Sequence, residues 1–131
     1  YALEASGNLV DWRVVAAFTA TNFISTWMDS HTASKHFYRL RDDTGFYAFS
    51  GRVLDSNTGL PIAGAEIYSP YDGSTTFTDN NGLFYLKTSV PTSWYFWSGY
   101  QLGISAVGYA ASEDYYYGSG LVSGLQIYLA P

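Results

Sequence analysis

The sequence predicts an all-β protein built as an antiparallel β-sandwich. Its 131 residues include thirteen tyrosines and thirteen glycines, and 19% of the chain is aromatic, a composition that favours strands and turns over helices. Apolar and polar residues alternate with a period of two along most segments, which is typical of half-buried strands. Clusters of Gly, Asn, Asp and Ser separate these segments in the way that turns separate strands.

The first part of the chain, residues 1–42, contains four expected strands. Each is an alternating or β-branched run, and turn-forming residues such as Gly7 and Asn8 follow it. None of these runs has the spacing of an amphipathic helix. We expect the strands at residues 1–6, 12–18, 19–28 and 35–41.

Residues 50–88 show the clearest succession of strands and turns. A cluster of turn residues at 55–59 ends one strand, and Pro61 starts the next segment with its φ already set. Asn81 and Gly82 predict a two-residue hairpin turn, because such a turn needs residues that accept positive φ. After that turn, alternation places Phe84 and Leu86 on one face. The expected strands are 46–54, 63–68, 75–78 and 83–87.

The last third of the chain begins with an intensely aromatic stretch at residues 93–98. Residues 101–107 then predict a strand with Leu102 and Ile104 on one face. Residues 113–120 combine two carboxylates with three consecutive tyrosines and predict a strand or a loop. Residues 124–130 predict the closing strand.

The central stretch follows the pattern G-x-V-x-D…T-G-x-P-x-x-G-A-x-I…D-x-x-G-x-F-x-L, and it resembles the carboxypeptidase regulatory-like domain. The resemblance covers residues 46–131 and implies a prealbumin-like, or transthyretin-like, β-sandwich. In that family the module is an accessory or structural unit of secreted proteins, and the resemblance implies no catalytic residues. The residues that carry it are Gly51, Val53, Asp55, Thr58, Gly59, Pro61, Gly64, Ala65, Ile67, Phe77, Asp79, Gly82, Phe84 and Leu86, with Phe77 where the family often has Thr or Ser.

Residues 1–42 resemble the later strands of an immunoglobulin-like or fibronectin-type module of large bacterial surface proteins. The residues that carry this resemblance are Tyr1, Leu3, Ala5, Ser6, Leu9, Trp12, Asp29, Phe37, Tyr38 and Arg39. Such a module implies earlier strands that precede Tyr1. We therefore expect either that the chain was cut from a longer one or that another chain completes the module, and a second copy could do so by strand addition.

Composition excludes several classes of function. The net charge of −5 offers no basic surface to nucleic acid. No apolar run approaches the ~20 residues of a membrane-spanning helix. The chain has no cysteine, which excludes disulfides and thiolate chemistry, and only 13% of its residues are charged. We expect an extracellular or cell-surface protein, of prokaryotic type, with part of its aromatic surface covered by a partner.

Catalytic and metal-binding constellations are sparse. Most aspartates lie in turns, where their side chains commonly bond the local backbone, so we expect no enzyme and no cofactor. His31 and His36 are five residues apart, which places them on opposite faces of a regular strand. Calcium is the one candidate ion, since two turns pair oxygen ligands at suitable spacing, although ordinary turn bonding is the favoured interpretation. These candidate ligands are Asp55, Asn57, Asp79 and Asn81.

Exposed aromatic residues are the main candidates for a binding surface. Neighbours on a strand face opposite sides, so residues 94–97 and 115–117 cannot all point inward. The favoured hypothesis is a structural subunit of a filament or surface appendage, which assembles with copies of itself by strand addition and aromatic contacts. The alternative is a carbohydrate-binding accessory module of a secreted enzyme or adhesin, with polysaccharide as its partner. The candidate residues for these surfaces are Tyr1, Leu3, Trp94, Trp97, Tyr100, Tyr115, Tyr116 and Tyr117.

Overall fold

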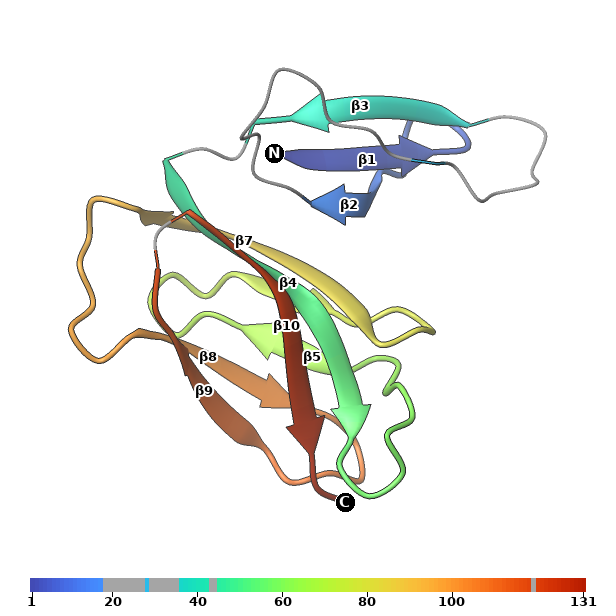
Figure 1. Ribbon diagram of the computed structural model, residues 1–131. Coiled ribbons are helices and arrows are strands. Elements are labelled where there is room, and N and C mark those ends of the chain that lie inside the picture. The colour runs from blue at the N-terminus through green and yellow to red at the C-terminus, as the bar shows by residue number, and fades with distance from the viewer. Residues whose placement is uncertain (18–27, 29–35, 43–44, 119) are drawn as a thin grey trace. The chain divides into compact units, whose positions relative to one another are not determined.

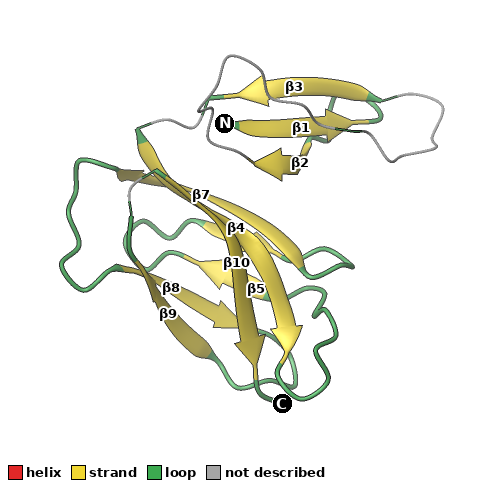
Figure 2. Ribbon diagram, viewed as in Figure 1, coloured by secondary structure: helices red, strands yellow, loops and turns green. Residues whose placement is uncertain are grey.

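The structure is a computed structural model that describes residues 1–17, 28, 36–42, 45–118 and 120–131 (Figure 1). The described residues contain strands, turns and loops but no helix, which confirms the all-β fold class (Figure 2). Among these same residues there is accordingly no apolar helix of membrane-spanning length. The chain forms two compact units, Tyr1–Thr44 and Gly45–Pro131, which we call unit 1 and unit 2.

Unit 1 contains a three-stranded antiparallel sheet with the order β2-β1-β3. Its strands are β1 (Ala2–Ser6), β2 (Arg13–Ala17) and β3 (Phe37–Arg41). The predicted strand at residues 19–28 lies outside the described residues except for Met28, which is exposed.

The position of β1 contradicts its expected role as a segment that pairs with another chain. β1 is the central strand of the sheet, and Leu3 is paired with Ala16 on one side and with Leu40 on the other. Both hydrogen-bonding edges of β1 are therefore used within unit 1. The side chains of Tyr1 and Leu3, two predicted interface residues, are half-buried.

Ser6 and Asn8 hold the turn between β1 and β2 through hydrogen bonds. The Asn8 carboxamide oxygen accepts hydrogen bonds from the amides of Val10 and Asp11, and the Ser6 hydroxyl accepts from those of Asn8 and Leu9. These bonds hold Leu9 at a φ of 64°, a conformation that costs a non-glycine residue free energy.

Unit 2 is a sandwich of two sheets, ordered β10-β4-β7 and β6-β5-β8-β9. All neighbouring strands are antiparallel except β10, which runs parallel to β4. The parallel pair joins the first and last strands of the unit. The strands are β4 (Phe46–Asp55), β5 (Glu66–Tyr68), β6 (Thr75–Phe77), β7 (Leu83–Pro91), β8 (Tyr100–Ser105), β9 (Ser112–Tyr116) and β10 (Leu121–Leu129).

The core of unit 2 lies between these two sheets. Alternate residues of each strand point inward, as predicted for the pairs Phe84 with Leu86 and Leu102 with Ile104. Burial of these apolar side chains is the main favourable contribution to the stability of the unit. The most deeply buried large residues are Tyr100, Phe49, Ile67, Leu86, Leu102, Ile104, Ile127, Leu129 and Val53.

The predicted hairpin at Asn81 and Gly82 is wrong. β6 and β7, which flank this turn, belong to different sheets, so the turn carries the chain from one layer of the sandwich to the other. Gly82 does have a positive φ of 72°, and the Asp79 carboxylate accepts hydrogen bonds from the amides of Asn81 and Leu83. The residue types of the turn are thus explained by its local geometry, but they do not decide which strands pair.

Candidate functional site

The loop between β7 and β8 and the loop between β5 and β6 meet at one end of unit 2. The contact between them is a pair of rings: Tyr71 of the β5–β6 loop lies 4.5 Å from Phe96 of the β7–β8 loop, centroid to centroid. Phe96 in turn packs on Tyr47 at 5.7 Å and on Tyr100 at 5.0 Å. Phe96 therefore anchors the β7–β8 loop to the core.

The same loop presents three other aromatic residues to solvent. Trp94, Tyr95 and Trp97 are 55%, 75% and 88% exposed. Tyr95 and Trp97 form an edge-to-face pair with centroids 5.1 Å apart, and the Tyr47 hydroxyl donates a hydrogen bond of 2.8 Å to the carbonyl of Trp94. Exposed rings on an anchored loop lose little conformational entropy when a partner covers them, which favours binding.

Tyr117, the residue that follows β9, extends this surface. Tyr115 and Tyr117 point outward while Tyr116 is half-buried against Phe49 at 6.0 Å, as alternation predicts. Tyr116 is paired with Tyr100, and a side chain on Gly99 would press on the backbone of Tyr116. We call Tyr71, Trp94, Tyr95, Trp97 and Tyr117 the aromatic end of unit 2.

Tyr100 was predicted to belong to the binding surface, and the structure contradicts this. Only 1% of Tyr100 is exposed, because β8 turns this ring toward the opposite sheet. Its hydroxyl shares a hydrogen bond of 2.7 Å with the buried Ser69 hydroxyl. Residues 93–98, the intensely aromatic stretch, form a loop in which only Phe96 packs against the core.

Asp72 fixes the β5–β6 loop beside this surface. Its carboxylate accepts hydrogen bonds from the Ser74 hydroxyl at 2.6 Å and from the amide of Ser89 in β7 at 2.5 Å. Burial works to raise the pKa of Asp72, but these hydrogen bonds outweigh it and the pKa lies below its usual value. The carboxylate is thus engaged in joining the loop to β7.

The buried Tyr100 and the half-buried Tyr116 make the stability of unit 2 sensitive to alkaline pH. Burial raises the pKa of Tyr100, and burial together with the Asp114 carboxylate raises the pKa of Tyr116 further. An unfolded tyrosine ionises near pH 10, so this stabilisation is complete below about pH 10 and is lost as pH rises above it. We expect the urea concentration at the unfolding midpoint to decrease as the pH is raised from about 9.5 to about 12. This decrease should be smaller in Tyr116→Phe. A midpoint that stays constant to pH 12 would contradict the assignment.

The two aspartates among the four candidate calcium ligands, Asp55 and Asp79, bond to the backbone of their own turns. The Asp55 carboxylate accepts hydrogen bonds from the amides of Thr58 and Asn57, which hold its pKa below the usual value, and its second oxygen accepts one from the Tyr109 hydroxyl. The Asp79 carboxylate bonds the amide of Asn81, as described above. Among the described residues no group of three or more His, Asp or Glu side chains could hold a metal ion. His31 lies outside these residues, and His36 stacks on Tyr38.

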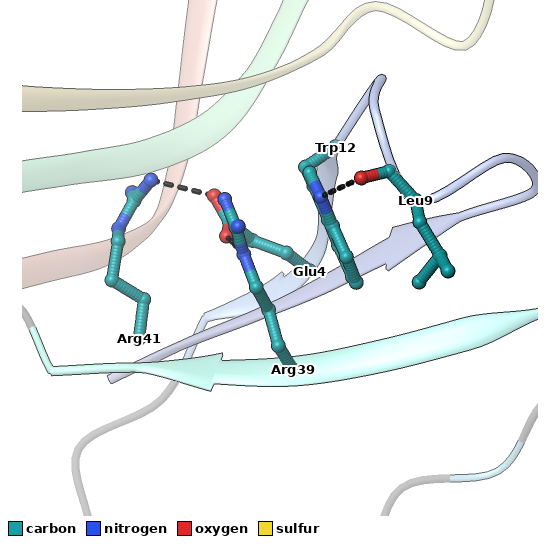
Figure 3. Close-up of polar contacts among 5 residues, drawn as sticks. All are labelled: Glu4, Leu9, Trp12, Arg39 and Arg41. Carbon is teal, nitrogen blue, oxygen red and sulfur yellow. Dashed lines mark hydrogen bonds and ion pairs between the residues drawn. The ribbon is translucent and has the colours of Figure 1, made fainter.

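Unit 1 contains a separate cluster of charged residues around Glu4 (Figure 3). The two carboxylate oxygens of Glu4 accept hydrogen bonds from Arg39 at 2.5 Å and from Arg41 at 2.6 Å. The Arg39 guanidinium lies 4.3 Å above the Trp12 ring, whose indole N–H donates to the carbonyl of Leu9. The Glu4 side chain is only 4% exposed, and the cluster links β1 to β3 and, through Arg39, to Trp12, the residue before β2.

Sequence reasoning missed Tyr71 and Asp72, which support the aromatic end. Both lie in a loop of common turn residues, and neither shows any pattern that distinguishes it from a solvent-exposed loop residue. Their roles depend on contacts with Phe96 and Ser89, which are distant in the sequence.

No family model matches the sequence, and a search of curated proteins found no match. Solved structures that match part of the chain include a type II cohesin–X-dockerin complex from Acetivibrio cellulolyticus, with 20% identity, a TM-score of 0.47, and coverage of 63% of this chain and 56% of that chain. A putative membrane-associated protein of unknown function from Bacteroides fragilis has 20% identity and a TM-score of 0.43, and the match covers 65% of this chain and 28% of that chain. The 3-chlorocatechol 1,2-dioxygenase of Rhodococcus opacus has 18% identity and a TM-score of 0.43, and the match covers 70% of this chain and 62% of that chain. These likenesses are too low to support an argument about function.

Proposed function

We propose that the protein is a non-enzymatic structural subunit of an extracellular assembly, such as a filament or surface appendage, and that a second copy covers its aromatic end. The observation that supports this most is the exposure of Trp94, Tyr95 and Trp97 on a loop that Phe96 anchors. Tyrosine and tryptophan are the residues that contribute most to protein interfaces. Only 13% of the residues are charged, so the chain has few surface charges that would oppose association through this surface.

The size of this surface fits a symmetric contact between two copies, which would be one interface of the assembly, while growth of a filament would require a second interface. An aromatic side chain buries about 150–250 Å² when it is fully covered. The aromatic end contributes five rings from each copy, so the contact would supply much of the ~1,600 Å² of a standard interface. Since β1 is already paired on both sides, the proposal rests on aromatic contacts and not on the addition of residues 1–6.

We also propose that unit 2 belongs to the carboxypeptidase regulatory-like family, in keeping with a bacterial extracellular setting. The turns that carry the sequence motif have structural roles that support this. Asp55 caps the turn after β4, and Gly59 and Gly64 take positive φ values of 70° and 71°. The Thr78 hydroxyl links the amide of Ala65 to the carbonyl of Ile62.

Replacing Trp97 with serine is expected to weaken self-association by about 30-fold or more, because truncating an interface hot spot costs about 2 kcal/mol or more. Trp97 is 88% exposed, so the fold should be unaffected. Light scattering over a concentration series would measure the mass of both proteins. Tyr128→Ser is the matched control, since Tyr128 is exposed on the outer side of the β10-β4-β7 sheet. A wild-type chain that stays at 14.5 kDa at every concentration would refute the proposal.

The second candidate function is a carbohydrate-binding accessory module. The exposed edge-to-face pair of Tyr95 and Trp97 favours it, because aromatic rings held at a fixed angle can stack on the apolar faces of sugars. Titration with soluble polysaccharides while tryptophan fluorescence is recorded would test it. A monomeric protein whose fluorescence responds to a glycan would support this function over self-assembly.

A further inference from the structure

We propose that the outer face of the β6-β5-β8-β9 sheet binds an extended, electrically neutral polysaccharide. This site is distinct from the aromatic end and adds a ligand class to the structural role proposed above. The register of the sheet defines the face. Ile67, Leu102 and Ile104 point into the core, so the residues that alternate with them point outward.

Three aromatic residues run diagonally across this face. Phe77 of β6 is paired with Glu66, Tyr68 of β5 is paired with Gly103, and Tyr115 of β9 is paired with Gln101. Each ring thus lies two residues further along the strands than the previous one, at the next position on the same face. With strands about 4.8 Å apart and about 3.4 Å per residue, the successive backbone positions are separated by about 8 Å and 12 Å. A track of this length suits a polymer rather than a single small molecule.

Gly103 allows the central ring of this track to lie across the sheet. A Cβ atom at Gly103 would overlap Cε1 and Cζ of Tyr68, so the ring occupies the space that a side chain would fill. The φ of Gly103 is not positive, so its backbone conformation does not require glycine, and glycine within a strand is unfavourable. The arrangement leaves Tyr68 37% exposed, as a ring over the strand rather than a side chain that projects from it.

Hydrogen-bonding groups surround the Tyr68 ring. Gln101 and Ser105 lie on either side of Gly103 in β8, and Glu113 of β9 is paired with Gly103. Glu66 neighbours Tyr68 on β5 and accepts a hydrogen bond of 3.4 Å from the Ser105 hydroxyl. These groups include an amide, a hydroxyl and two carboxylates, which can donate to and accept from the hydroxyls of a sugar whose apolar face stacks on the ring.

The charge of the face selects the kind of polysaccharide. The four strands contain no Lys, Arg or His, whereas Glu66 and Glu113 both lie on the outer face. An acidic glycan would meet two carboxylates with no cation to balance them, so the face disfavours uronates and sulfated chains. A protein partner would need an apolar centre, but here the centre is one partly exposed ring within polar groups.

The experiment uses the full chain with regenerated cellulose, insoluble chitin and gels containing soluble xylan or mixed-linkage β-glucan as probes. The expected result is binding to at least one of these neutral probes and none to polygalacturonate. Tyr68→Ala and Tyr115→Ala should each weaken that binding at least tenfold, while the matched control Tyr128→Ala, on the outer face of the other sheet, should leave it unchanged. Because Tyr115 is half-exposed at the edge strand, Tyr115→Ala tests the site even if Tyr68→Ala fails to fold.

Several outcomes would overturn the proposal. These are no binding to any neutral probe, binding to polygalacturonate as strong as to the neutral probes, or equal losses from Tyr68→Ala and Tyr128→Ala. Loss of binding in Trp97→Ser but not in Tyr115→Ala would place the sugar at the aromatic end instead. The failure of this site and the failure of self-assembly are separable, because Tyr68→Ala should leave the mass measured by light scattering unchanged.

Discussion

Replacing Phe49 with alanine is expected to destabilise unit 2 by about 3–5 kcal/mol, a large share of the 5–15 kcal/mol that stabilises a typical domain. Phe49 is fully buried in β4, the central strand of its sheet. Its ring lies 4.8 Å from Tyr100 and 6.0 Å from Tyr116. Alanine would leave a cavity beneath the rings that anchor the aromatic end, so this substitution should also impair the binding surface.

Urea unfolding followed by near-ultraviolet circular dichroism would measure this effect. The matched control is Phe77→Ala, since Phe77 is 62% exposed on the short edge strand β6. A surface substitution of this kind should change the free energy of unfolding by about 0.5 kcal/mol or less. If Phe49→Ala cost no more than Phe77→Ala, the ring network would not be the centre of the core.

The sequence predicted the core of unit 2 well because burial follows local alternation. A strand with one face against a partner sheet must place apolar residues at every second position, and Phe84, Leu86, Leu102 and Ile104 satisfy this rule. The alternation of Tyr115, Tyr116 and Tyr117 was readable for the same reason. In each case the signal lies within a few neighbouring residues.

Features that depend on pairing between distant segments were not predictable in the same way. The turn at Asn81 and Gly82 has the composition of a hairpin, yet it joins two sheets, because β6 pairs with β5 and β7 pairs with β4. Residues 93–98 have strand-like composition but form a loop, because the ring of Phe96 is held by Tyr47, Tyr71 and Tyr100 from three other segments. Tertiary contacts override local propensity in both places.

The two proposed binding surfaces differ in the same way in how far the sequence predicts them. Exposed tryptophans could be recognised from the impossibility of burying residues 94–97 together. The role of Gly103 could not be recognised from the sequence. It depends on the register of the sheet, which places Tyr68 opposite Gly103. Likewise, the central position of β1 follows from pairing with β3, which lies more than thirty residues away along the chain.

The double substitution Arg39→Leu with Arg41→Leu is expected to destabilise unit 1 by about 3–5 kcal/mol, the cost of leaving a buried charge without its partners. Both arginines bond the Glu4 carboxylate, which lies in the central strand and is almost completely buried (Figure 3). Hydrogen exchange of the β1 amides would report the loss, because these amides are exposed to solvent only when the sheet opens.

Adding Glu4→Gln to this double variant should recover much of the lost protection, because glutamine has the shape of glutamate without its charge and is far less costly to bury. The double and triple variants both lack the contact between Arg39 and Trp12, so the difference between them isolates the effect of the carboxylate. If the two variants exchanged at the same rate, the loss would come from packing of the arginine side chains and not from the buried charge. Recovery in the triple variant would instead show that the charge of Glu4 makes both arginines necessary to unit 1.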